Sequence, residues 1–143
     1  MTTEAPTRIE NAQGSFVDRI LPLQQRVGGA WNTLGGPDGS HVNSRQIRIV
    51  LRAELAYRRA VRKEKGQPPS ETETLLARAA RFNSLEGQSA AFAFFEQAHN
   101  TRMELLSGTM AADTGIDTVA DRQLTASGAA MTHLSRLMAN QRV

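Results

Sequence analysis

The stretch RQIRIVLRAELAYRRAVRKEKG, residues 45–66, decides the fold class, because its apolar residues recur at the spacing of a helix. On a helical wheel of about 100° per residue, one side collects the apolar residues Ile47, Val50, Tyr57 and Val61. The opposite side collects the basic residues Arg45, Arg48, Arg52, Arg59 and Lys63. Asn43 or Ser44 can cap the first turn, and Gly66 can end the last one. The stretch therefore predicts an amphipathic helix near residues 43–65.

Apolar stripes of the same period occur on both sides of this stretch, and Gly and Pro residues separate them. They predict helices near residues 7–30, 43–65, 70–107 and 117–140. Pro22 predicts a kink in the first helix, because proline removes a backbone donor and clashes with the preceding turn. The expected fold is all-α, with four or five amphipathic helices, partly extended, and a Gly/Pro-rich connector near residues 34–43. We expect residues 1–40 to form an N-terminal arm with the kinked helix, and residues 41–143 to form a helical core domain.

Two apolar stripes are expected to be interfaces. The first stripe consists of Phe16, Ile20, Leu23, Val27 and Trp31. The second belongs to a heptad seam of about three repeats and includes Leu124, Met131, Leu134 and Met138. Contiguous apolar stripes of this length usually mark interaction sites, because water does not solvate them well. We therefore expect a homo-oligomer or a larger protein assembly.

The positive charge of the chain is concentrated in the basic helix. The chain has a formal net charge of +3, whereas residues 45–66 hold eight Arg or Lys and two Glu, so the remainder is negative. Cysteine is absent, which excludes disulfides and thiolate metal sites. The sequence shows no signal-peptide pattern and no apolar run near the roughly 18 residues that span a bilayer. We expect a cytoplasmic or virion protein without a membrane span.

The sequence matches no common catalytic motif, so we expect no enzyme, no cofactor and no metal site. None of the three histidines, His41, His99 and His133, has a second ligand at metal-binding spacing. The segment AADTGIDTVAD, residues 111–121, resembles the active-site stretch of retroviral-type aspartic proteases. In that family a D-[ST]-G loop supplies one carboxylate per subunit, and two such carboxylates share a proton and activate a water. The resemblance covers about ten residues, and the Ala-rich flanks depart from the apolar strand that precedes the Asp in the family.

These observations support three hypotheses about function. The first is a non-catalytic helical structural or assembly subunit of a multi-subunit particle, such as a phage virion or a secretion apparatus, which acts by protein–protein association. In style the chain is similar to helical adaptor and assembly proteins of phage particles, although no motif ties it to a named family. The alternative is a basic-helix nucleic-acid-binding or packaging accessory protein, because a ladder of cations suits phosphates. The third is a DTG-type aspartic protease.

Overall fold

The computed structural model describes the main chain of residues 4–112 and 118–142, and the side chains of residues 15–107 and 121–141. Over these residues the chain is all-α, as predicted, and contains no strand. The helices are α1 (Glu4–Thr33), α2 (Ser44–Lys65), α3 (Glu71–Ala79), α4 (Leu85–Ala112) and α5 (Thr118–Arg142). α1 continues through Pro22 as one helix.

The predicted end signals of α2 are confirmed. The Asn43 side chain accepts a hydrogen bond from the Gln46 backbone N–H at 2.9 Å, and the Gln46 side chain binds the Asn43 backbone N–H in return. Gly66 ends the helix in the left-handed conformation, with φ of 62°. Ser70 caps α3 by accepting from the Glu73 backbone N–H. Local sequence therefore determines both ends of α2 and the start of α3.

The single helix predicted near residues 70–107 is two helices, which is a correction. α3 ends at Ala79 and α4 begins at Leu85, with a tight turn between them. Gly87 lies so close to this turn that a Cβ atom there would stand 1.8 Å from the Arg81 carbonyl oxygen. The chain thus changes direction between α3 and α4, and Gly87 allows this because only glycine permits such a close approach.

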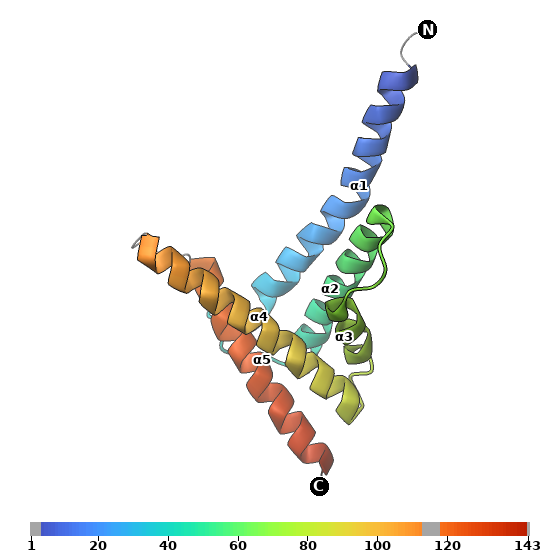
Figure 1. Cartoon of the computed structure of the whole chain (residues 1–143). Helices are drawn as coiled ribbons and strands as arrows, with labels where there is room; N and C mark the ends of the chain where they lie inside the picture. Colours follow the sequence, from blue (N-terminus) through green and yellow to red (C-terminus); the bar gives the residue numbers. More distant parts are fainter. Residues whose placement is uncertain (1–3, 113–117, 143) are drawn as a thin grey trace.

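The helices form two antiparallel pairs with α3 alongside (Figure 1). α1 and α2 run side by side, and α4 and α5 form a second pair that crosses the lower end of α1. Trp31 of α1 meets Phe95 of α4 with ring centroids 5.6 Å apart, and Phe95 meets Phe94 at 5.4 Å. The edge-to-face arrangement of these rings is a favourable aromatic geometry. These three aromatic residues join the two helix pairs into one core.

The core includes Ala30, Trp31 and Leu34, so the buried cluster crosses the predicted boundary at residue 40. The division into an arm and a core domain stays a prediction for the projecting, N-terminal part of α1, which extends past the end of α2 (Figure 1). Within the described residues, no helix is both long enough and apolar enough to cross a membrane.

The two predicted interface stripes are covered to different extents. In α1, Ile20 and Trp31 are buried, whereas Phe16, Leu23 and Val27 are half-buried. In α5, Leu134 is fully buried, and the half-buried members of the seam are Leu124, Met131 and Met138. The seam packs mainly against α4 of the same chain. The buried members of both stripes are therefore already covered within one chain, and the exposed remainder is what a partner can contact.

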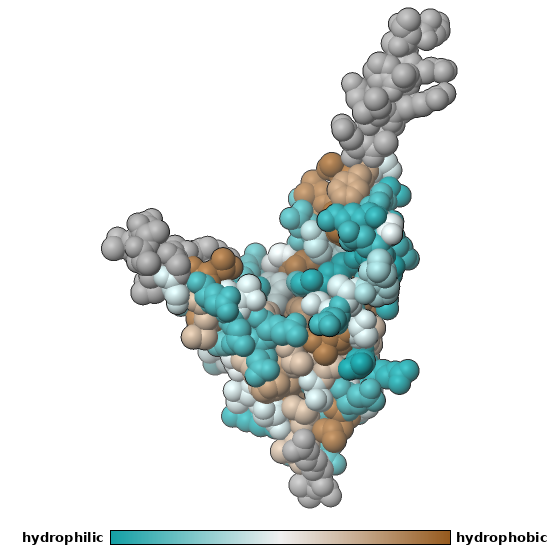
Figure 2. Space-filling model, viewed as in Figure 1, coloured by the Kyte–Doolittle hydropathy of each residue, from teal (hydrophilic) through white to brown (hydrophobic). Residues whose placement is uncertain are grey.

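Two apolar residues of α1 that lie outside the predicted stripe are also exposed. Val17 is 49% exposed and Leu21 is 43% exposed. Figure 2 shows apolar residues gathered on α1 where it leaves the body of the molecule. An exposed apolar patch on a helix that extends beyond its own core is a typical feature of an interaction surface.

Candidate functional site: the basic face of α2

The basic residues predicted on one side of α2 divide into two groups. Arg45, Arg52, Arg59 and Lys63 are exposed, and none has an ion pair or hydrogen bond within the described part of the chain. Arg48 is half-buried instead. The four exposed cations form a face that is open to a partner, whereas Arg48 is already engaged.

Arg48 is held by the turn between α3 and α4. Its Nη2 donates to the Asn83 Oδ1 atom at 2.6 Å, and its guanidinium carbon lies 4.8 Å from the centre of the Phe82 ring. Its Nε atom is buried and has no acceptor among the described residues. Arg48 therefore packs α2 onto the following turn, and only part of its charge faces outward. Sequence reasoning missed this because a helical wheel does not show which distant residues meet a helix.

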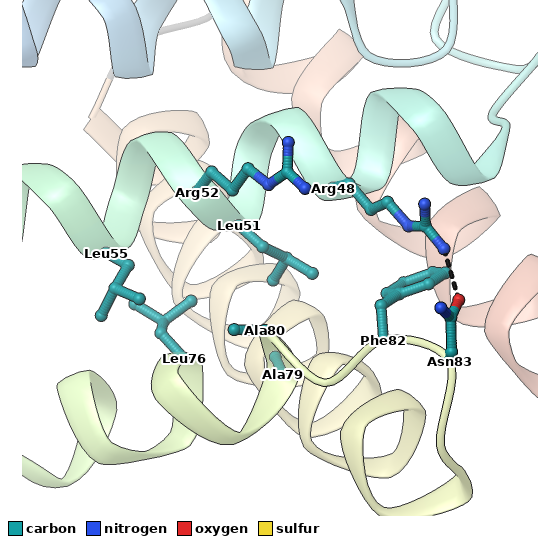
Figure 3. Close-up of a pocket in the computed structure, with 9 residues that line it drawn as sticks. All are labelled: Arg48, Leu51, Arg52, Leu55, Leu76, Ala79, Ala80, Phe82 and Asn83. Atoms are coloured by element: carbon teal, nitrogen blue, oxygen red, sulfur yellow. Dashed lines mark hydrogen bonds between the residues drawn. The ribbon is translucent and has the colours of Figure 1, made fainter.

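A pocket opens between α2 and α3 beside these arginines (Figure 3). Its volume is about 130 Å³, and its floor is apolar, formed by Leu51, Leu55, Leu76, Ala79 and Phe82. Arg48, Arg52, Ala80 and Asn83 complete the lining. Figure 3 shows both arginine side chains lying along the α2 side of the pocket. A cavity of about 150 Å³ holds a benzene ring, so this pocket accepts one medium-sized apolar side chain.

The chemistry of the pocket favours an apolar group next to a carboxylate. Burial of an aliphatic or aromatic side chain against the apolar floor is favourable, because it removes apolar surface from water. Exposed Arg52 offers the planar fork that binds a carboxylate through two parallel hydrogen bonds. The apolar floor and Arg52 together can bind an apolar side chain and a neighbouring carboxylate on another protein surface.

Two further basic residues of α2, Arg58 and Arg62, hold the fold together. Arg58 pairs with buried Glu54 through its Nε atom at 3.1 Å, and the two residues lie four positions apart on one face of α2. Arg62 pairs with buried Glu73 of α3 at 2.6 Å. The Glu73 carboxylate thus binds Arg62, while the Glu73 backbone N–H donates to the Ser70 cap. These two pairs tie α2 to its own turn and to α3.

Two serine–histidine contacts join helices that are distant in sequence. The His133 Nε2 atom lies 2.7 Å from the Ser44 Oγ atom, and the His99 Nδ1 atom lies 2.8 Å from the Ser127 Oγ atom. Burial lowers the pKa of His133 from its usual value of 6.5, with nearby Arg136 acting in the same direction. In the part of the chain that the structure describes, no carboxylate is hydrogen-bonded to either ring, as a catalytic triad would require. We interpret both contacts as links between helices.

The DTG segment falls outside the described residues, since residues 113–117 belong to the gap between α4 and α5. The described flanks of this segment are helical, whereas the protease motif follows a strand. The structure thus adds no support to the third hypothesis. The described residues also contain no group of three or more His, Asp or Glu positioned to hold a metal ion.

Comparison with known proteins gives no relative. No family model matches the chain, and no curated protein or solved structure matches it significantly.

Proposed function

We propose that this protein is a non-catalytic helical subunit of a multi-subunit particle, such as a phage virion or a secretion apparatus, and that it acts by protein–protein association. The observation that carries this proposal is the pocket between α2 and α3, with its apolar floor and its arginine rim. A surface that combines an apolar pocket with one exposed cation is suited to binding an apolar side chain and an acidic side chain of another protein. It is less suited to a nucleic acid, whose phosphates offer no apolar group for the floor.

The occupant that the chain itself offers is α1 of a second copy. Asp18 and Leu21 are both exposed near the middle of this helix, next to the last turn of α2, and they are three residues apart, so they are neighbours on one face. Leu21 would fill the pocket, and the Asp18 carboxylate would meet Arg52. Because α1 and the α2–α3 pocket are different surfaces, the contact is head-to-tail, and it generates a ring or a filament. Both architectures suit a particle.

A charge-swap experiment tests this proposal. Asp18→Arg and Arg52→Glu should each shift the protein towards monomer in size-exclusion chromatography with light scattering. The double variant should restore association, because it restores opposite charges across the same contact. Arg59→Glu is the matched control, since Arg59 is equally exposed on α2 but does not line the pocket. A wild-type protein that stays monomeric at millimolar concentration, or a double variant no better than the single ones, would refute the head-to-tail contact.

A second candidate is nucleic-acid binding, favoured by the four exposed cations Arg45, Arg52, Arg59 and Lys63. Four phosphate contacts predict a log–log salt slope of about −3.6 on B-DNA. In this hypothesis Arg52→Glu and Arg59→Glu weaken binding equally, because phosphate contacts are nearly uniform along the helix. We expect weak or no binding of labelled duplex and single-stranded DNA at low salt. Sub-micromolar affinity at physiological salt would place this candidate first.

A further inference from the structure

A larger cleft lies where α1, α2 and α4 meet, and it shares no lining residue with the pocket between α2 and α3. Its volume is about 440 Å³, which falls in the range of about 300–1,000 Å³ that is usual for small-ligand sites. The apolar part of its wall is formed by Trp31, Phe94, Ala98 and Leu105. All five helices contribute to the lining, with Thr72 from α3 and Gln123 from α5. The cleft is therefore fixed by the packing of the whole fold.

A guanidinium is placed against the aromatic wall of this cleft. The Arg102 guanidinium carbon lies 4.0 Å from the centre of the Trp31 ring, which is a close cation–π contact. Arg102 also donates from Nε to the Gln123 Oε1 atom at 3.1 Å and from Nη1 to the Ala98 carbonyl at 3.2 Å. These contacts hold the guanidinium in one orientation. Its Nη2 group has no hydrogen bond within the described residues, so a donor is left for a ligand.

The charges around the cleft do not cancel. Three of the residues that line it are charged, namely Glu54, Arg58 and Arg102. Glu54 is fully engaged, because one carboxylate oxygen accepts from the Trp31 indole N–H at 3.2 Å and the other from Arg58. Arg58 neutralises Glu54, so the charge of Arg102 is left over and the lining carries a net +1. A half-buried cation whose nearby carboxylate, Glu54, is already paired with Arg58 favours a further anion as its partner.

We infer that this cleft binds a monoanionic carboxylate carried on a short apolar body, with Arg102 holding the carboxylate and Trp31, Phe94 and Ala98 contacting the body. One carboxylate balances the net +1 of the lining. A phosphate monoester carries about −1.5 to −2 at neutral pH and would leave excess negative charge beside Glu54. The carboxylate can come from a free acid or from the C-terminus of a peptide, and the probes below separate the two.

The sole tryptophan of the chain makes the test direct, because Trp31 is its only indole and lies in the cleft wall. We would titrate the folded full-length protein with phenylacetate and follow the Trp31 indole N–H by NMR. The matched probes are phenylacetamide, phenyl phosphate, and a short peptide ending in Phe with either a free or an amidated C-terminus. Phenylacetate should give a saturable shift in the millimolar range, as expected for a probe of this size. The neutral amide and the phosphate should each bind at least ten times more weakly.

The peptide arm identifies the source of the carboxylate. A free-acid peptide that binds more tightly than phenylacetate, with its amide inactive, indicates a polypeptide end. A peptide that fails while phenylacetate binds indicates a free acid. Both outcomes support the carboxylate site.

Variants locate the binding residue. Arg102→Gln should weaken phenylacetate binding at least tenfold, whereas Arg59→Gln removes the same charge outside the cleft and should leave it unchanged. Because Arg102 touches Trp31, the affinity of this variant should also be measured by calorimetry, and its fold by circular dichroism. Equal binding of acid and amide, no saturable shift, or full affinity in folded Arg102→Gln would overturn the inference.

Discussion

The contact between Trp31 and Glu54 makes a quantitative prediction about stability. Glu54 is 8% exposed and accepts a hydrogen bond from the Trp31 indole across the α1–α2 interface. A hydrogen bond to a charged group contributes about 1.5–3 kcal/mol. The ion pair with Arg58, whose side chain is 40% exposed, adds only about 0.3–0.5 kcal/mol because solvent screens it. Glu54→Ala should therefore lower the free energy of unfolding by about 2–3.5 kcal/mol.

Two further variants separate the hydrogen bond from the charge. Glu54→Gln retains an acceptor for the indole but makes it neutral, so its loss should be about half as large. Glu64→Ala is the control on the same helix, because Glu64 pairs with Arg19 at the surface and this pair should contribute less than about 1 kcal/mol. Urea unfolding, followed by the helical circular dichroism signal at ~222 nm, measures the free energy of unfolding of all three variants at constant m-value. If Glu54→Ala and Glu64→Ala agree within about 0.5 kcal/mol, the buried acceptor assigned to Glu54 is wrong.

Three further predictions address packing, backbone and pH. Leu134→Ala should cost about 2–5 kcal/mol in urea unfolding, since the side chain is fully buried, and a change under about 0.5 kcal/mol would mean that the seam is exposed. Gly28→Ala should stabilise the protein by about 0.5–1 kcal/mol, because a Cβ atom there meets nothing within 4 Å, whereas Gly87→Ala should destabilise it by clashing with the Arg81 carbonyl. The folded pKa of His133 is below its value of 6.5 in the unfolded chain, so its contribution should be complete above pH 6.5 and be lost as the pH falls from there through the folded pKa. His133→Gln should remove that part of the acid dependence in thermal unfolding, and an unchanged pH profile would contradict the assignment.

Local signals in the sequence determine much of this fold. Asn43, Gly66 and Ser70 act over a few residues, so their effects on α2 and α3 were predictable. The division between α3 and α4 was not, because the apolar stripe continues across the turn and only the close approach at Gly87 shows the change of direction. An apolar stripe indicates the period of a helix but does not determine the angle between that helix and the next.

The candidate sites were less predictable than the fold. Arg52 and Arg59 look alike on a helical wheel, yet Arg52 lines the pocket between α2 and α3 and Arg59 does not. Trp31 was expected at an interface between chains, but Phe94 and Phe95 cover it within one chain. No sequence pattern indicated Arg102, because its contact is with the ring of Trp31, which is located 71 positions earlier. Pairings between helices decide these cases, and no local pattern encodes them.

The order in which the helices pack has a consequence for synthesis on the ribosome. The most extensive helix–helix contacts join α1 with α2, α2 with α3, α3 with α4, and α4 with α5. Such local contacts favour rapid folding, in microseconds to milliseconds. Trp31, however, is covered by Phe95, which emerges roughly 60 residues later, or about 3–12 s at translation rates of about 5–20 residues per second. During those seconds the α1–α2 hairpin can form while Trp31 still lacks its cover from Phe95, so this apolar surface is exposed to other molecules before the core is complete.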